Sequence, residues 1–313
     1  MEIDLTTSDT LSSVEKTYKA REVEGFLDVY FYRKVGFWLA QFFARLKVTP
    51  AGVTLLGGVC GIIAGHLYYY RDLRVNIAGM VLHVLANAFD NADGQLARLT
   101  GGGSREGRVI DSLVDHIIWI NLYFHLGFRC LNESAFLVVA LIAFPAGFSH
   151  ALQGAAADYY RSCYLFFIKG RERTDSSSSS ALLSDYRKLS WRHQAWYKFL
   201  LALHLNFTRQ QEMLSPRLKS LRDLVERLFP DQIPDWLRAR YQAFARPMFK
   251  WWSLLMTNTR MLLLFGFLLV GQPIWWFWIQ LTIFNLLLVY LIRRQENMSQ
   301  SLLTLVRARA DSA

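Results

Sequence analysis

Cysteine is scarce in this sequence, with three residues among 313, and none of them has the spacing of a metal site or a disulfide framework. Cys60, Cys130 and Cys163 lie in or beside apolar stretches, where a thiol packs as a small apolar group. The cysteines therefore argue against a disulfide-stapled fold and against a cysteine-ligated metal.

Two other motifs are missing. The run Gly101-Gly102-Gly103 is not followed by the Gly-Lys-Ser/Thr of a phosphate-binding P-loop, so residues 100–106 are predicted to form a turn between helices. Residues 1–24 lack the apolar stretch of a secretory signal and are predicted to form a polar N-terminal arm.

Apolar residues are abundant: 53% of the chain is hydrophobic and 15% is aromatic, which is high for a soluble protein. A transmembrane helix needs about 20 mostly apolar residues. Candidate segments lie at about 51–70, 76–96, 109–130, 134–164, 251–270 and 274–292. The sequence therefore predicts an all-α integral membrane protein with six transmembrane helices.

The basic residues support this topology because they gather on one side of the predicted membrane. They are frequent in 1–48, 98–108, 169–248 and 293–313, and sparse in the loops that face the other side. Both termini are thus predicted to be cytosolic. The net charge of +10 is explained by this topology and by attraction to anionic membrane lipids, so nucleic acid is not a predicted partner.

The core of the membrane domain is predicted to follow an interfacial segment. Residues 25–47 mix aromatic with basic side chains, which is typical of an amphipathic helix in the membrane interface. Thr49 and Pro50 predict the start of the first span, as N-cap and first helical residue. Residues 48–168 are predicted to hold spans one to four, and residues 249–292 spans five and six.

Residues 169–248 are polar and are predicted to form an insert in the cytosol or on the membrane surface. The serine run at 176–180 is predicted to be a flexible linker. Helices are predicted at about 182–206 and 215–229, with prolines interrupting the pattern beyond them. Residues 293–313 are predicted to form a cytosolic tail.

The most informative pattern lies across the second and third predicted spans. Asp90 and Asp93 fall on one stripe of a helix, and Asp111 and Asp115 share a stripe of the next helix. Placed face to face, the stripes gather four carboxylates, which repel one another unless cations or protons bind. Such oxygen ligands suit hard divalent ions, here Mg²⁺ or Mn²⁺.

The pattern D-x2-D-G-x2-A-R-x8-G-x3-D-x3-D resembles the signature of the CDP-alcohol phosphotransferases. All of its fixed residues are present at matching spacing: Asp90, Asp93, Gly94, Ala97, Arg98, Gly107, Asp111 and Asp115. The sequence of residues 48–54 also resembles the entry of that family into its first span. The resemblance implies transfer of a substituted phosphate from a CDP-alcohol to an acceptor hydroxyl, with release of CMP, and it implies a homodimer.

The acids of the motif are predicted to hold metal and to take a proton. Two ions bound by Asp90, Asp93, Asp111 and Asp115 would neutralise the diphosphate and the leaving CMP. An acceptor hydroxyl is a poor nucleophile near neutral pH, so one carboxylate should accept its proton. The resemblance makes Asp115 this base. Because the basic segment 98–108 lies between the acids, the active site is predicted to open to the cytosol.

Small and basic residues beside the acids are predicted to bind the nucleotide. The small residues leave room for a close approach of the ligand or of another helix, and the arginine makes charge-assisted hydrogen bonds to phosphate or cytidine oxygens. His83 and Asn87 continue the stripe of the acids and are predicted to support them or to pack. The predicted nucleotide-binding residues are Gly94, Ala97, Arg98 and Gly107.

Two further polar features are candidates for binding the acceptor. The resemblance implies that the end of the fourth predicted span binds the acceptor, and this segment carries His150, Asp158 and Arg161 beside small residues that let helices approach closely. Arg260 lies inside the fifth predicted span, where an arginine is costly unless it meets a partner, water or an anion. Asp158 or an acceptor phosphate is predicted to face it. Interface anchoring and a shifted span boundary are the alternatives.

The identity of the two alcohols stays open, because the motif recognises the cytidine diphosphate. CDP-diacylglycerol as donor with a small polar alcohol as acceptor is favoured. A soluble choline- or ethanolamine-type donor with diacylglycerol or ceramide as acceptor is the alternative. Residues 153–157 lack the basic residues of similar inositol-phosphate transferases, which counts against a phosphorylated acceptor. A cation-binding membrane transporter is the alternative of another class, although the acids lie near one membrane face.

Overall fold

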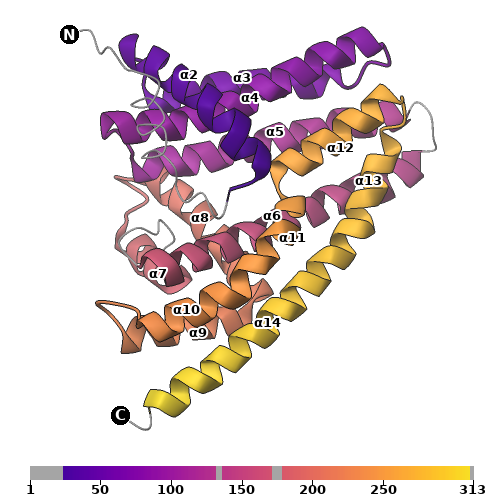
Figure 1. The fold of residues 1–313 in the computed structure, drawn as a ribbon. Helices are drawn as coiled ribbons and strands as arrows, with labels where there is room; N and C mark the ends of the chain where they lie inside the picture. Colours follow the sequence, from indigo (N-terminus) through magenta and orange to yellow (C-terminus); the bar gives the residue numbers. More distant parts are fainter. Residues whose placement is uncertain (1–23, 132–135, 171–177, 311–313) are drawn as a thin grey trace. The chain divides into compact units, whose positions relative to one another are not determined.

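The computed structural model describes residues 24–131, 136–170 and 178–310, and nearly all of the predicted polar arm lies outside these residues. The described part is helical and contains no strand (Figure 1). Two compact units are formed, one by Met1–Gly147 with Leu262–Trp276 and one by Phe148–Met261 with Phe277–Ala313. The predicted all-α fold is therefore confirmed for the described residues.

The first unit begins with a π-helical turn, η2 (Asp28–Tyr32), that runs directly into an α-helix. This segment confirms the predicted helix within 25–47. It is followed by the helices that carry the acidic motif and by the first part of a longer helix. Their bounds are α2 (Arg33–Arg45), α3 (Pro50–Leu67), α4 (Leu73–Thr100), α5 (Arg105–Leu131) and α6 (Phe136–Lys169).

The remaining elements belong mostly to the second unit. The bounds in the insert are α7 (Ser179–Lys188), α8 (Ala195–Leu214), α9 (Pro216–Leu228) and α10 (Asp235–Ala245). They are followed by η4 (Arg246–Met248), α11 (Phe249–Trp252), η5 (Ser253–Leu255), α12 (Thr257–Leu269), α13 (Ile274–Leu281) and α14 (Ile283–Ala310).

Among the described residues, three segments are long and apolar enough to cross a membrane: Pro50–Leu67, Asp235–Leu269 and Ile274–Ala310. They contain most or all of the first, fifth and sixth predicted spans. The other three predicted spans coincide with α4, α5 and α6. Polar residues such as Asn76, His83 and Asn87 lower the hydropathy of α4, so six spans stay a prediction.

The ends of the motif helices are fixed by local chemistry. Thr49 Oγ1 accepts a hydrogen bond of 3.2 Å from the Gly52 amide, which confirms the predicted N-cap of α3. At the end of α4, Gly101 adopts a φ of 65°, a left-handed conformation that suits glycine. Ser104 Oγ then accepts a hydrogen bond of 2.8 Å from the Gly107 amide at the start of α5. The predicted turn over residues 100–106 is confirmed for residues 101–104, because α4 ends at Thr100 and α5 begins at Arg105.

Glycines on α3 let α4 and α5 approach it closely. A Cβ added to Gly57 would lie 3.2 Å from Phe89 Cβ of α4. Added Cβ atoms at Gly58 and Gly61 would lie 2.8 Å from Val114 Cγ1 and 2.6 Å from Ile118 Cδ1, both on α5. Small residues at such spacing are typical of packed membrane helices. These glycines therefore set how closely α3 packs against each of the two helices that carry the acids.

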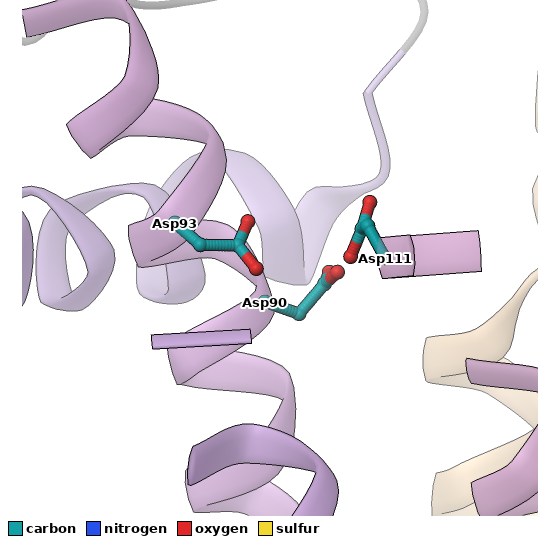
Figure 2. A group of neighbouring side chains, drawn as sticks. All are labelled: Asp90, Asp93 and Asp111. Atoms are coloured by element: carbon teal, nitrogen blue, oxygen red, sulfur yellow. The ribbon is translucent and has the colours of Figure 1, made fainter. Parts of the chain in front are cut away.

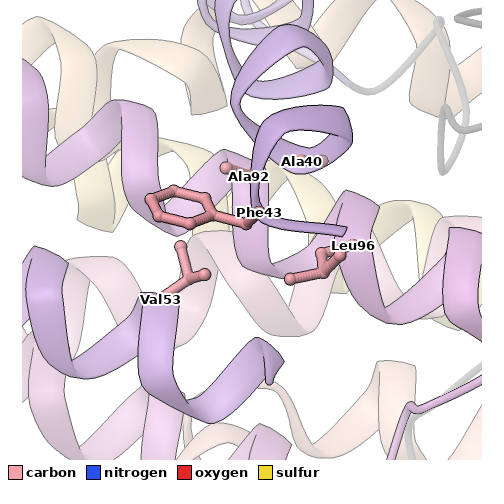
Figure 3. Close-up of a cluster of buried hydrophobic side chains, with 5 residues drawn as sticks. All are labelled: Ala40, Phe43, Val53, Ala92 and Leu96. Atoms are coloured by element: carbon pink, nitrogen blue, oxygen red, sulfur yellow. The ribbon is translucent and has the colours of Figure 1, made fainter. Parts of the chain in front are cut away.

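Helix α2 packs on the part of α4 that carries the motif. Ala40 and Phe43 of α2 form a buried apolar cluster with Val53 of α3 and with Ala92 and Leu96 of α4 (Figure 3). Because Ala92 and Leu96 flank the turn of α4 that carries the motif, this cluster holds that turn in place.

A hydrogen bond from the same turn of α4 reinforces the contact. Gln95 Nε2 donates a bond of 3.1 Å to the Arg33 carbonyl oxygen of α2. Gly36 of α2 lies where a Cβ would come within 2.9 Å of Gln95 Nε2. Helix α2 is therefore also part of the support of the motif.

The opposite end of these helices is held by a buried arginine. Arg129 Nη1 of α5 lies 3.1 Å and 3.0 Å from the carbonyl oxygens of Tyr68 and Tyr70, at the end of α3. The same nitrogen lies 2.7 Å from Asn76 Oδ1 of α4. An arginine at a helix C-terminus satisfies carbonyl groups that have no partner within the helix.

The insert departs from its prediction in two places. Ser178 caps α7 and Ser179 begins it, so the described part of the serine run starts a helix and is not a flexible linker. Glu212 stabilises this start by accepting from the Ser179 amide at 2.9 Å and hydroxyl at 2.5 Å. The helix predicted at 182–206 is broken, because Ser190 Oγ accepts from the Arg192 amide at 3.2 Å and competes with the helical pattern.

The last helices also differ from their predicted bounds. The fifth predicted span is interrupted by the 3-10 turn η5 before α12 begins at Thr257. Helix α14 continues to Ala310, although residues 293–313 were predicted only as a tail. Glu296 of α14 accepts hydrogen bonds of 2.8 Å and 3.1 Å from the Arg217 and Leu218 amides at the start of α9. Packing against the insert therefore accounts for the extra turns.

Candidate active site

Two helices supply the carboxylates of the site. Asp90 and Asp93 come from α4, and Asp111 comes from the second turn of α5 (Figure 2). One oxygen of each carboxylate lies within 4.8 Å of the others. Asp93 is buried, Asp111 is half-buried and Asp90 is exposed. The convergence that the helical spacing predicts is therefore present for these three acids.

One pair of carboxylates joins the two helices. The side chains of Asp90 and Asp111 point toward each other (Figure 2) and share a hydrogen bond. Two ionised carboxylates cannot make such a contact, so a proton or a cation must lie between them. Three oxygen-donor side chains with this spacing fit a hard divalent ion such as Mg²⁺ or Mn²⁺.

Asp115 lies one helical turn beyond Asp111 and is exposed. Its charge interacts with the charges of Asp90 and Asp93, so it belongs to the same electrostatic cluster. It stands outside the compact group of three carboxylates. This position leaves Asp115 open to a substrate that approaches the group.

Thr54 of α3 contacts the buried acid of the site, although its sequence position gave it no predicted role. Its Oγ1 lies 2.5 Å from Asp93 Oδ2 and 3.1 Å from the Pro50 carbonyl oxygen. A hydroxyl has one proton to donate, and the carboxylate is the closer and stronger of the two acceptors. The hydroxyl therefore donates to Asp93. The hydrogen bond orients the Asp93 carboxylate. A polar side chain in an apolar span was the one signal of this role.

Open space lies beside the small residues of the motif. A Cβ added to Gly94 would meet, among the described residues, only the guanidinium of Arg98, at 3.6 Å. The absence of a side chain at Gly94 is therefore not required by packing of the described chain. At Gly107 a Cβ would meet the Ser104 hydroxyl at 3.0 Å, so Gly107 lies at a helix start and not in a close helix contact. Both positions fit a ligand that approaches the backbone.

Arg98 and Ala97 complete the motif at the end of α4. Arg98 is exposed, and its positive charge acts on Asp93. Ala97 is half-buried and presents only a methyl group near Gly103. The cationic side chain thus stands at the exposed rim of the acidic group, where it can meet an anionic ligand.

The two polar residues that precede the acids on α4 have packing partners. His83 is buried, with Nδ1 3.3 Å from the Tyr68 hydroxyl and its ring against Trp119 and Phe265. Asn87 contacts the Tyr32 hydroxyl of η2, and burial raises the pKa of that phenol. Both residues therefore support the helices behind the site.

The acceptor candidates all lie in the second unit. Asp158 Oδ2 accepts a hydrogen bond of 3.0 Å from Gln211 Nε2 of α8, whereas the sequence predicted Arg260 as a partner. His150 and Arg161 are half-buried on α6. The acids of the motif belong to the first unit, so the structure does not place them together with these residues.

Arg260 is fully buried in the first turn of α12 and has a different set of partners from the predicted ones. Its guanidinium donates to the Leu255 carbonyl oxygen, to Gln153 Oε1 at 2.8 Å and to Gln280 Oε1. Its carbon atom Cζ also lies 5.2 Å from the centre of the Phe284 ring. The residue therefore joins α6, α12 and α13 within the second unit. A start of α12 at Thr257 favours the shifted-boundary interpretation.

Comparisons with known proteins find similarity over the segment that carries this site. Residues 47–159 match the family model described as CDP-alcohol phosphatidyltransferase. A phosphatidylinositol phosphate synthase of Mycobacteroides abscessus is 31% identical over 102 residues, which are 30% of this chain and 42% of that protein. An archaetidylinositol phosphate synthase of Pyrococcus horikoshii is 35% identical over 74 residues, 24% of this chain and 38% of that protein.

A longer protein shows the same kind of match. A bifunctional IPC transferase and DIPP synthase of Thermococcus kodakarensis is 28% identical over 120 residues, which are 38% of this chain and 27% of that protein. The chain thus spans less than half the length of these relatives. The matched segment contains α3, α4, α5 and the start of α6, and with them every acid of the site. Residues 47–159 of this chain are therefore similar to the CDP-alcohol phosphatidyltransferase family.

Proposed function

We propose that this chain transfers a substituted phosphate from a CDP-alcohol to an acceptor hydroxyl and releases CMP. The observation that carries the proposal is the group of three carboxylates within 4.8 Å, on two helices of the matched domain. Asp90, Asp93 and Asp111 would hold the divalent ions, two Mg²⁺ or Mn²⁺. Bound there, the ions supply positive charge to the diphosphate and to the leaving CMP.

The residues beside the acids bind and orient the nucleotide in this proposal. Gly94 leaves the helix backbone open to the ligand, and the small side chain of Ala97 leaves room beside it. Arg98, exposed at the end of α4, donates charge-assisted hydrogen bonds to phosphate or cytidine oxygens. Gly107 gives the ligand room at the start of α5.

Asp115 is the proposed base. The acceptor oxygen attacks the phosphorus atom that carries the donor alcohol, and the bond from that phosphorus to the oxygen of CMP breaks. The proton of the acceptor hydroxyl passes to the Asp115 carboxylate. The exposure of Asp115, one turn from Asp111, supports this role because the acceptor must reach the base.

The proposed donor is CDP-diacylglycerol, and the proposed acceptor is a small polar alcohol. The similarity to phosphatidylinositol phosphate and archaetidylinositol phosphate synthases favours an inositol phosphate. In contrast, Gln153 in the fourth span is buried and holds Arg260, and residues 153–157 carry no basic side chain. An acceptor panel should therefore include inositol, its 1-phosphate, serine and glycerol 3-phosphate.

Membrane sidedness is part of the same proposal. The basic segments predict that the acids and both termini face the cytosol. A homodimer also stays a prediction. Protease accessibility of residues 181–247 in sealed vesicles would test the sidedness.

The central experiment is CMP release by purified full-length protein with Mg²⁺ or Mn²⁺. CDP-diacylglycerol, CDP-choline and CDP-ethanolamine are compared as donors, and lipid products are identified by mass spectrometry. Asp111→Asn and Asp115→Asn should each abolish release. Asp235→Asn is the matched control, because that side chain is 89% exposed at the start of α10. Equal release by the wild type and by both site variants would refute the proposal.

A further inference from the structure

A second group of metal-ligand side chains lies in the first unit, at the other end of α3. His66 of α3 and His125 of α5 face each other, with Nδ1 of His66 3.0 Å from Nε2 of His125. Twelve residues separate His66 from Thr54 on the same helix, which is about 18 Å at 1.5 Å per residue. The pair is therefore distinct from the acidic site.

The other two ring nitrogens of the pair also have partners. His125 Nδ1 lies 2.8 Å from the Asn121 carbonyl oxygen, and His66 Nε2 lies 3.4 Å from the Tyr70 hydroxyl. A carbonyl can only accept, so His125 carries its proton on Nδ1 and its Nε2 has a free lone pair. His66 therefore donates from Nδ1 to that lone pair, and the Tyr70 hydroxyl donates to His66 Nε2.

This arrangement is the one that metal-binding histidines need. A ligating imidazole usually donates its other N–H to a carbonyl, carboxylate or hydroxyl oxygen, which fixes the ring. His125 already does so toward Asn121. His66 needs only to move its proton from Nδ1 to Nε2, where the Tyr70 oxygen can accept it. Both facing nitrogens then offer lone pairs, and no proton is lost to solvent.

The distance between the facing nitrogens indicates the kind of ion. Metal–imidazole bonds are about 2.0–2.1 Å long, so nitrogens 3.0 Å apart subtend an angle of about 95° at the ion. This angle suits neighbouring positions of tetragonal or octahedral coordination, as for Cu²⁺ or Ni²⁺. A tetrahedral Zn²⁺ would need the nitrogens only a few tenths of an ångström farther apart. Hard ions such as Mg²⁺ prefer oxygen and are disfavoured.

The site can be reached from water. His66 and Tyr70 are exposed and His125 is half-buried. His66 lies in the last turn of Pro50–Leu67, the candidate span, and three tyrosines follow, as is typical of a membrane–water interface. We propose that His66 and His125 form a binding site for a late first-row transition-metal ion, with water as the remaining ligands, that joins α3 to α5.

The first test is Ni²⁺ binding to the full chain. The protein is purified with a tag other than polyhistidine, stripped of metal and titrated by calorimetry in detergent with excess Mg²⁺ present. One Ni²⁺ should bind per chain and raise the melting temperature. His66→Asn and His125→Gln place amide atoms where the facing nitrogens stand, so they keep the hydrogen bond and should lose Ni²⁺ binding.

Two further variants separate ligation from general effects. Tyr70→Phe should weaken Ni²⁺ binding about tenfold, because it removes the oxygen that accepts from His66. His116 lies on α5, as His125 does, and its Nδ1 is 2.6 Å from the Ser112 carbonyl oxygen. His116→Ala should leave Ni²⁺ binding unchanged. Melting temperatures without metal show that each variant is folded.

A spectroscopic measurement counts the ligands. The electron paramagnetic resonance spectrum of one bound Cu²⁺ should show coupling to two imidazole nitrogens in the wild type and to fewer in either histidine variant. The proposal is overturned if the wild type binds no Ni²⁺, or if His66→Asn and His125→Gln bind it as the wild type does. It is overturned equally if Cu²⁺ coupling is the same in all three proteins.

Discussion

At one end of the α3–α4–α5 bundle three carboxylates meet within 4.8 Å, and at the other end Arg129 meets oxygen atoms of Tyr68, Tyr70 and Asn76. Both ends join the same helices through polar side chains. The two ends differ in the signs of the charges that face one another. Like charges meet at the first end, whereas a cation meets partial negative charges at the second. The second end is complete as it stands, whereas the first requires protons or cations.

This difference separates a structural polar cluster from a functional one. A cation with several carbonyl and amide partners stabilises the fold and needs no ligand. A group of acids destabilises the fold when empty and becomes stable when an ion binds. Substitutions at the two ends should therefore change stability in opposite directions, and only one end should affect catalysis directly.

Asp111→Asn should have the largest effect on activity. Loss of one ligand removes several kcal/mol of charge stabilisation, so CMP release should fall by about a thousandfold or more. The melting temperature without metal should stay equal or rise, because one negative charge is removed from the acidic group. The increase in melting temperature with Mn²⁺ should disappear. A variant that melts earlier without metal and still responds to Mn²⁺ would contradict the comparison.

Arg129→Met should have the opposite profile. Removal of the guanidinium leaves buried oxygens without their donor, and the free energy of unfolding should fall by about 3 kcal/mol. CMP release per folded molecule should stay within about twofold of the wild type, because the acids lie at the other end. Arg74→Met, at an exposed residue near the start of α4, is the control for loss of a basic side chain. Melting temperature and activity are measured on the same preparations.

Gly61→Ala tests whether the close approach of α3 and α5 connects the two ends. The added Cβ would lie 2.6 Å from Ile118 Cδ1, so the free energy of unfolding should fall by about 1–3 kcal/mol. Ile118→Ala should partly relieve the clash, and the double variant should be more stable than the sum of the single effects predicts. Gly266→Ala, where an added Cβ meets nothing within 4 Å, should be neutral or slightly stabilising. Additive effects would show that the contact is unimportant.

Helical periodicity and local residue preferences in the sequence predicted the acidic end of the bundle and several helix bounds. Asp90, Asp93 and Asp111 could be placed together because their spacing fixes which side of each helix they occupy. Thr49, Pro50 and the glycines of the turn gave the helix bounds by their own conformational preferences. The six-span topology is supported for three segments and stays a prediction for α4, α5 and α6.

Contacts between residues far apart in the sequence were not predictable in this way. Arg129 had no predicted role, although it is buried among carbonyl groups at the end of another helix. Arg260 was expected to meet an acid and meets two glutamines. The starts of α7 and α9 in the insert depend on Glu212 and Glu296, which lie distant in sequence from the helix ends that they stabilise.

Thr54→Val tests how much a single hydrogen bond contributes at the acidic end of the bundle. The hydroxyl has two acceptors, Asp93 Oδ2 and the Pro50 carbonyl oxygen four residues earlier in α3. If the bond to the carboxylate matters, its loss should weaken Mn²⁺ binding about tenfold, since hydrogen bonds to charged groups are worth about 1.5–3 kcal/mol. Thr54→Ser keeps the hydroxyl and should bind Mn²⁺ nearly as the wild type does.

The control for Thr54→Val isolates the second acceptor. Thr208 is buried and donates 2.9 Å to the His204 carbonyl oxygen four residues earlier, so Thr208→Val removes only a bond of the helix-internal kind. Mn²⁺ binding, followed by electron paramagnetic resonance, should be unchanged in Thr208→Val. Equal affinity in Thr54→Val and the wild type would show that the orientation of Asp93 does not depend on Thr54. A selective loss in Thr54→Val would instead extend the acidic group to a third helix, since α3 would then contribute to metal binding without supplying a ligand.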